Sequence, residues 1–248
     1  PEVPAGQELV MRKVSFAYDG GAPVFQDLTL TARPGDMIGI TGPVACGKST
    51  LGRLFLCEQP YEGSVCLGGH ELAELSAREI AASVGHLGHD PELWNDTVEA
   101  NVLCGSDGDA MQWLSMTALD GEVRAMEQGV QTVVGSNGVR LSGGQAQRLA
   151  LARTLAHPRP VLVLDDPFSA LDRETEDAVF ENLKAYAQDK VVFLISHRLY
   201  HFPELREIIF MENGSVTVGT HQKLLDSVPA YRALYESQTG GAGHETQR

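Results

Sequence analysis

The order of hydrophobic and polar residues predicts strands in the first part of the chain. Apolar side chains alternate with polar ones through residues 8–40, for example at Val14 and Phe16, and turn-forming residues interrupt the alternation. A strand that alternates in this way buries one face and exposes the other. We therefore expect short strands in this segment, together with a buried strand over residues 37–40.

Helical and strand patterns alternate in the second half of the chain. Two continuous apolar runs, residues 161–164 and Val191–Ile195, are separated by a helical pattern over residues 175–187. Runs without a polar face are typical of strands covered on both sides, and strands joined through a helix are usually parallel. We therefore expect a parallel sheet between helices. The other expected elements are helices over 48–56 and 149–156, a strand over 61–67 and a helical lobe over 92–140.

A glycine-rich segment connects the expected strand at 37–40 to the helix at 48–56. It matches the pattern G-x-x-x-x-G-K-[ST] and extends one residue beyond it, over Gly42, Pro43, Val44, Ala45, Cys46, Gly47, Lys48, Ser49 and Thr50. Glycines let successive backbone N–H groups point at phosphate oxygens, and the following helix adds its positive end. Lys48 can reach the outer phosphates, and the Ser49 hydroxyl can bind Mg²⁺. The segment predicts a phosphate-binding loop.

An acidic residue follows the apolar run at 161–164. Asp165 stands where a buried strand ends, a position from which a carboxylate can reach a Mg²⁺ ion at a phosphate loop. By itself, an acidic residue after a strand caps a helix about as often as it binds a metal ion. The phosphate loop makes a metal-binding role for Asp165 the stronger interpretation.

Between these two features, a short polar segment precedes a helical pattern. Its residues are Leu141, Ser142, Gly143, Gly144 and Gln145. Such a helix start exposes free N–H groups to an anion, although a serine-capped helix without a ligand is the plainer alternative. The segment resembles the signature of ATP-binding cassette (ABC) transporters. Together with the phosphate loop and the strand-end acid, it makes the sequence similar to the nucleotide-binding domains of that family over nearly all of residues 8–237. The resemblance implies ATP and Mg²⁺ as ligands, ATP hydrolysis, and a head-to-tail dimer in which this signature completes a second domain's site.

The resemblance also implies a fold. The expected class is α/β, with a P-loop NTPase (RecA-like) core, an antiparallel β subdomain and a helical subdomain. A single nucleotide-binding domain would cover residues 1–237, and a flexible tail would follow at 238–248. The expected parts are the β subdomain at 8–40, the P-loop core at 41–91 and 146–220, and the helical signature lobe at 92–145.

Further positions match the family one by one. Tyr18 resembles the aromatic residue that stacks on adenine, and residues 169–172 resemble the D-loop, which lies along the dimer interface. His197 resembles the switch histidine that contacts the γ-phosphate. Because His197 follows the apolar run Val191–Ile195, we expect it at the same sheet edge as Asp165.

Two stretches favour the exporter branch of the family. Residues 132–138 resemble the exporter segment that precedes the signature, although its two usual charged residues are missing. Residues 219–225, with Tyr231, Tyr235 and Gln238 beyond them, resemble the C-terminal ending of exporters with fused membrane domains. The resemblance implies a transmembrane domain N-terminal to this segment in the same polypeptide. That domain would dock on the helical lobe, at the cytoplasmic face of the cell membrane.

Three positions depart from the family pattern. Ala45 replaces a glycine of the loop, which should be tolerated if its φ is negative. His89 replaces a glutamine that contacts Mg²⁺ and the attacking water, and an imidazole is a poor ligand for Mg²⁺. Asp166 stands where the family has a glutamate that polarises this water, and its side chain is one methylene shorter. We therefore expect Asp166, His197 and His89 to form a catalytic group that hydrolyses ATP slowly.

An intact signature combined with Asp166 and His89 resembles the degenerate half of heterodimeric exporters. In such a pair, this chain's own site would be weak while its signature serves a partner's active site. A homodimer with two slow sites is the alternative. A non-hydrolysing module whose association depends on ATP is a further alternative.

Composition narrows these functions. The chain has 19 Lys and Arg against 33 Asp and Glu, for a net charge of −14 and a pI near 4.9, and it shows no basic stripe. An acidic surface repels nucleic acid, which disfavours the soluble ABC-type ATPases that act on it. No apolar run approaches the ~18 residues of a membrane span. Four scattered cysteines without a CxxC pair indicate reduced thiols and disfavour a zinc site.

Overall fold

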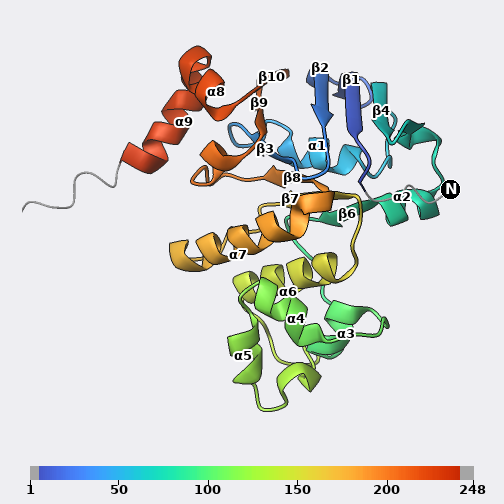
Figure 1. Ribbon diagram of the computed structural model, residues 1–248, viewed down its shortest axis with the longest axis vertical. Helices are drawn as coiled ribbons and strands as arrows, with labels where there is room; N and C mark the ends of the chain where they lie inside the picture. The colour runs from blue at the N-terminus through green and yellow to red at the C-terminus, as the bar shows by residue number, and fades with distance from the viewer. Residues whose placement is uncertain (1–5, 241–248) are drawn as a thin grey trace, which may run out of the picture.

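The computed structural model describes residues 6–240, which form two β-sheets, surrounding helices and a helical lobe (Figure 1). The strands are β1 Leu9–Ala17, β2 Pro23–Ala32, β3 Met37–Thr41, β4 Glu62–Leu67, β5 His70–Glu71, β6 Val84–Leu87, β7 Val161–Asp165, β8 Val191–Ile195, β9 Glu207–Glu212 and β10 Ser215–Gly219. The α-helices are α1 Lys48–Leu54, α2 Ala77–Ser83, α3 Val98–Leu103, α4 Ala110–Met116, α5 Asp120–Arg124, α6 Gly143–Ala156, α7 Arg173–Tyr186, α8 His221–Ser227 and α9 Pro229–Thr239. The α/β organisation expected from the sequence is confirmed.

The six-stranded sheet has the order β10-β9-β3-β8-β7-β6, and all neighbours except β10 and β9 are parallel. Every residue of β3, β7 and β8 is buried. Successive side chains of a strand point to opposite faces, so β7 divides its residues between two cores. Val161 and Val163 pack with α1 and the second sheet, whereas Leu162 and Leu164 pack with α6 and α7. The continuous apolar runs are therefore those of strands covered on both faces.

The antiparallel sheet has the order β2-β1-β4-β5, and its extent differs from the β subdomain expected at 8–40. β3 belongs to the six-stranded sheet, while β4, expected within the core, pairs with β1 so that Leu67 lies opposite Leu9. All five β3 residues are buried, which requires cover on both faces, whereas β4 exposes Glu62 and buries Val65. The half-exposed strand therefore joins the outer sheet.

The helical lobe contains α3, α4 and α5 and has its own apolar core (Figure 1). Helix α6 connects the lobe to the sheet because its side chains enter two cores. Leu149 and Ala152 pack with the lobe, whereas Leu151 and Leu155 pack under the six-stranded sheet. The boundary expected at residue 145 thus falls inside a helix shared by both parts.

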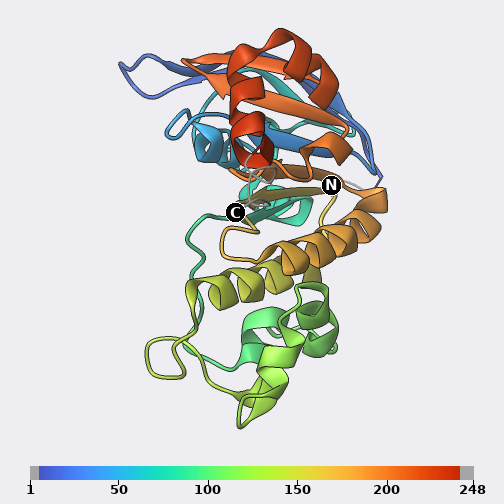
Figure 2. The same cartoon turned by 90° about the vertical axis from the view of Figure 1, so that its left-hand side faces the viewer.

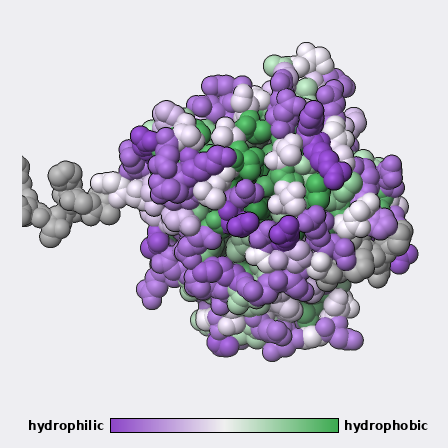
Figure 3. Space-filling model, turned by 45° about the horizontal axis from the view of Figure 1, so that its top comes forward, coloured by the Kyte–Doolittle hydropathy of each residue, from purple (hydrophilic) through white to green (hydrophobic). Residues whose placement is uncertain are grey.

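Helices α8 and α9 end the described chain. The flexible tail expected over 238–248 is wrong at its start, because Gln238 and Thr239 belong to α9, and residues 241–248 of that tail lie outside the described residues. Within residues 6–240, no helix combines the length and apolar character needed to cross a membrane. Hydrophilic side chains cover most of the face in Figure 3 and surround a central group of apolar ones.

Candidate nucleotide-binding site

The phosphate loop leaves the buried end of β3 and leads into α1. Gly42 has φ 153° and Gly47 has φ 101°, conformations that L side chains rarely adopt. A Cβ atom at Gly42 would lie 2.1 Å from the Met211 carbonyl oxygen, and one at Gly47 would lie 2.2 Å from Val24 Cγ1. Both positions therefore require glycine, because the conformation and the close approach each exclude a side chain.

Ala45 also adopts the left-handed conformation, with φ 62°. The condition under which the loop should tolerate alanine, a negative φ, is therefore not met. The reason lies in the turn around it, where the Cys46 N–H donates to the Pro43 carbonyl at 3.3 Å and the loop curls back towards α1. A left-handed alanine costs about 1 kcal/mol, so the loop carries strain that a glycine would relieve.

Lys48 lies across the phosphate loop. Its Nζ donates to the carbonyl oxygens of Gly42 at 2.9 Å and Pro43 at 2.8 Å, and it lies 3.7 Å from Cys46 Sγ. These partners hold the ammonium group without neutralising its charge. Residues 44–50 line a cavity of about 290 Å³ together with His197. A phosphate group bound in this cavity would therefore contact the loop, Lys48 and His197 together.

Tyr18 follows the last residue of β1 and lies beside the loop. Its hydroxyl is 3.1 Å from Thr50 Oγ1, a hydrogen bond that connects the aromatic side chain to α1. The ring packs edge-on against Phe16, with centroids 4.9 Å apart, and the residue remains 45% exposed. Tyr18 and residues 43–47 line one cavity of about 370 Å³. A ligand bound there can contact the ring and the loop at the same time.

Three expected catalytic residues meet at the carboxyl ends of three neighbouring parallel strands. His89 follows β6, Asp166 follows β7 and His197 follows β8. Asp166 Oδ2 lies 3.9 Å from His89 Nδ1 and 3.7 Å from His197 Nε2. Both distances exceed hydrogen-bond length, so the carboxylate faces two imidazoles without being bonded to either. The Asp166 side chain is buried and both imidazoles are about half exposed.

The residues expected at a metal are Ser49, Asp165 and His89. Asp165 ends β7 and is 5% exposed, and Ser49 is exposed in α1. No three His, Cys, Asp or Glu side chains within residues 6–240 could enclose a metal ion. Mg²⁺ usually takes one or two carboxylates together with water and substrate phosphates. One hydroxyl and one carboxylate therefore suit Mg²⁺ that arrives with a nucleotide, whereas the His89 nitrogen is a poor ligand for it.

His86, in the middle of β6, was not singled out by the sequence. Burial lowers the pKa of His86, and the nearby charge of Asp165 opposes this effect. The Nε2 atom is buried and has no hydrogen-bond partner among the described residues. Burial therefore favours the neutral form of the His86 imidazole.

The signature segment does not join the phosphate loop of its own chain. Ser142 caps α6, where its Oγ accepts from the Gln145 N–H at 3.2 Å while Gln145 Oε1 accepts from the Ser142 N–H at 2.9 Å. A Cβ at Gly144 would lie 2.9 Å from Ala170 Cβ, so this glycine allows α6 to approach the D-loop. Figure 2 shows the start of α6 and helix α1 in different layers but towards the same side of the molecule.

The family comparison agrees with this arrangement. Residues 25–169, more than half of the chain, match the family model described as "ABC transporter". The chain belongs to the ABC transporter family. Its signature segment, phosphate loop and strand-end acid all lie within the matched residues.

Individual relatives of this ABC domain are exporters. A "Probable multidrug resistance ABC transporter ATP-binding/permease protein" of Bacillus subtilis is 33% identical over 95% of this chain and 43% of that protein. An "ATP-dependent lipid A-core flippase" of Burkholderia pseudomallei is 36% identical over 91% of this chain and 39% of that protein. A solved structure, described as a bacterial Atm1-family ABC exporter with ATP bound, matches 96% of this chain and 44% of its own, with 30% identity and a TM-score of 0.87. The chain is thus an exporter-type nucleotide-binding domain that spans less than half the length of these relatives.

Two further side chains of the ABC domain support the site from behind: Gln147, which is buried, and Arg198, which is partly exposed. Gln147 Nε2 donates to the Asp165 carbonyl at 3.2 Å and reaches Gly88, next to His89, at 3.5 Å. It therefore connects the signature helix to two strand ends. The sequence shows this glutamine just after the signature, but its partners are far away in the chain and no local pattern indicates them.

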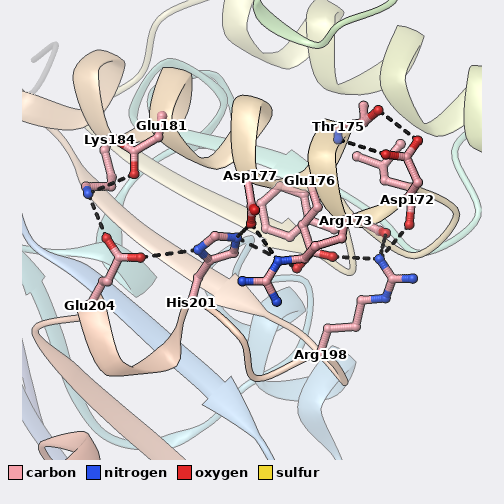
Figure 4. A network of polar contacts seen from close by, with 12 residues as sticks. Asp172, Arg173, Thr175, Glu176, Asp177, Glu181, Lys184, Arg198, His201 and Glu204 are labelled. Atoms are coloured by element: carbon pink, nitrogen blue, oxygen red, sulfur yellow. Dashed lines mark hydrogen bonds and ion pairs between the residues drawn. The ribbon is translucent and has the colours of Figure 1, made fainter. Parts of the chain in front are cut away.

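Arg198 supports the D-loop in a similar way (Figure 4). Its Nη1 donates to the Leu171 carbonyl at 2.7 Å and to Glu176 Oε2 at 2.6 Å. Glu176 is 1% exposed, so Arg198 compensates a buried carboxylate. The arginine follows His197 directly, and it thereby joins the switch segment, residues 196–199, to α7.

Proposed function

We propose that the chain binds MgATP at its phosphate loop and that ATP joins it head to tail to a second ABC nucleotide-binding domain. The observation that supports this most is the division of the site. The phosphate loop and the signature lie towards the same side of the molecule but in different layers (Figure 2). One chain therefore cannot close its own site, whereas two chains facing each other can close two.

The proposed ligand contacts follow from the loop. Lys48 binds the outer phosphates, Ser49 and Asp165 hold Mg²⁺ on them, and Tyr18 stacks on the adenine. When bound, Mg²⁺ would neutralise phosphate charge and polarise the γ-phosphoryl oxygens, so that water attacks a more electrophilic phosphorus. In trans, the start of α6 offers the free N–H groups of the signature to the γ-phosphate of the partner's nucleotide.

The proposed catalytic group is Asp166 with His197 and His89. Asp166 orients the attacking water, and His197 faces the γ-phosphate from the cavity that it shares with the loop. Asp166 is one methylene short of the usual glutamate, and His89 lacks the amide of the usual glutamine. We therefore assign slow hydrolysis to the chain's own site, while its signature serves a partner that is either a second copy or a different domain.

The proposed role is to power an exporter. The Bacillus subtilis relative is an ATP-binding/permease protein, which supports a transmembrane domain in the same polypeptide as this chain. The helical lobe is the proposed docking surface for that domain. The chain would then work at the cytoplasmic face of the membrane.

The test is ATP-dependent association measured by sedimentation velocity. With MgATP, the wild-type chain should form dimers that ADP does not support. Ser142→Arg should abolish these dimers and leave ATP affinity unchanged, because the bulky cation blocks the signature but not the phosphate loop. Ser106→Arg, at an exposed serine in the loop after α3, is the matched control. Wild-type dimerisation by Ser142→Arg would refute the head-to-tail assignment.

A second candidate function is a non-hydrolysing module in which ATP only controls association. The positions of Asp166 and His89 favour this candidate, because Asp166 Oδ2 and His89 Nδ1 lie 3.9 Å apart, beyond hydrogen-bond distance. The two candidates predict the same dimers but different turnover. Single-turnover release of phosphate from bound ATP would support the ATPase, and its complete absence would support the module.

A further inference from the structure

The C-terminal helix α9 is anchored to the six-stranded sheet. Tyr231 is fully buried, and its ring packs against Phe210 of β9 with centroids 5.8 Å apart. The Tyr231 hydroxyl lies 2.7 Å from His221 Nδ1, and the His221 ring also packs edge-on against Tyr235, at 4.6 Å. These contacts fix both the position and the rotation of α9.

Gln238 lies two turns after Tyr231 on the same face of α9, since residues seven apart align along a helix. Its side-chain amide makes two hydrogen bonds to the main chain of the switch segment. Nε2 donates to the His197 carbonyl at 2.7 Å, and the Leu199 N–H donates to Oε1 at 2.9 Å. The Gln238 amide thus donates to the residue before Arg198 and accepts from the residue after it.

The switch segment has few other main-chain supports beyond β8. Ser196 Oγ bonds to the Arg198 N–H and carbonyl, both at 2.9 Å, and the Arg198 side chain bonds to the D-loop (Figure 4). These bonds hold residues 196 and 198. In the described chain, the peptide carbonyl of His197 is bonded by Gln238, and the half-exposed imidazole extends from this peptide towards Asp166.

We propose that Gln238 is a positioning residue for His197, so that the C-terminal helix holds the switch histidine at the γ-phosphate. This inference rests on the proposed function. Gln238 does not line the cavity that residues 44–50 form with His197. It acts by fixing the direction of the peptide that carries the imidazole, and misplacement by about 1 Å can cost about 100-fold in rate.

The experiment compares Gln238→Met with Gln222→Met in the 248-residue chain. Methionine keeps the length of the side chain and removes both hydrogen-bonding groups. Gln222 lies in α8 and bonds only to Asp226 Oδ1 among the described contacts, at 2.9 Å, so its substitution tests the loss of a glutamine without touching the switch segment. The readouts are the rate of single-turnover hydrolysis and the ratio of ATP affinity to ADP affinity.

We expect Gln238→Met to slow hydrolysis by about tenfold and to lower ATP affinity several-fold, with ADP affinity unchanged. Gln222→Met should match wild type in both readouts. In a His197→Ala background, Gln238→Met should have no further effect, because the imidazole it positions is absent. A merely structural role of α9 would instead lower ADP affinity as well and would persist without His197.

The outcomes separate the inference from the function on which it rests. If the wild-type chain binds no ATP, the proposed function fails. If wild type binds ATP and discriminates it from ADP, but Gln238→Met retains that discrimination, the positioning role is overturned. The affinity ratio decides this even if hydrolysis is too slow to follow.

Discussion

Replacing Asp166 with glutamate tests whether the reach of this carboxylate limits hydrolysis. Asp166 Oδ2 lies 3.9 Å from His89 Nδ1 and 3.7 Å from His197 Nε2. A further methylene extends the side chain by about 1.5 Å, which is enough to bring the carboxylate within hydrogen-bond distance of either imidazole or of a water between them. We expect Asp166→Glu to accelerate ATP hydrolysis.

The size of the effect follows from the geometry. A shortfall of about 1 Å in the position of a catalytic group costs up to about 100-fold, and general-base catalysis contributes about 100- to 10,000-fold in total. We therefore expect a gain of about 10- to 100-fold, which corresponds to about 1.4–2.7 kcal/mol in activation free energy. The full gain should require His89→Gln as well, because both side chains position the same water.

The assay is single-turnover hydrolysis with saturating MgATP, so that binding does not limit the rate. Asp166→Asn is the matched control, since it keeps the size of the side chain but removes the charge, and it should abolish the residual hydrolysis while preserving ATP binding. The backbone at position 166 has φ 54°, which aspartate tolerates better than glutamate. Urea unfolding of each variant separates a lost fold from a changed rate.

Two results would refute this reasoning. Fast hydrolysis by the unmodified chain would show that Asp166 already reaches the water. A folded Asp166→Glu, His89→Gln double variant with the rate of wild type would show that another step limits turnover.

Three further substitutions test the phosphate loop and the proposed adenine site. Lys48→Ala should weaken ATP binding, measured by calorimetry, by about 10- to 100-fold, because it removes charge-assisted hydrogen bonds to phosphate. Lys223→Ala in α8 is the control and should bind ATP like wild type; equal ATP affinities of the two variants would contradict the phosphate-loop assignment. Tyr18→Ala should lower ATP affinity by about tenfold or more but leave inorganic triphosphate unaffected, since stacking involves the base; equal losses for both ligands would argue against stacking. Ala45→Gly should raise the free energy of unfolding by about 0.5–1 kcal/mol in urea, because it relieves the left-handed alanine at φ 62°. Ala233→Gly, in the exposed interior of α9, should lower it by about 1 kcal/mol, and destabilisation by both would exclude strain at Ala45.

The sequence by itself determined the features whose physics is local. The phosphate loop could be found because glycines, a lysine and a serine must occur at fixed spacing between a strand and a helix. Asp165 and His197 could be assigned to one sheet edge because two apolar runs of similar length, separated by a helix, indicate neighbouring parallel strands. The core strands were identifiable for the same reason, since a run without a polar face must be covered on both sides.

Tertiary contacts decided the rest. Whether β4 joins the core or the outer sheet depends on its pairing with β1, which is distant from it in the chain. The residues 238–239 look like a polar tail in sequence, yet the burial of Tyr231 extends a helix through them and delivers Gln238 to the switch segment. These features arise from atoms that are distant in the chain and close in space, so no local pattern of residues encodes them.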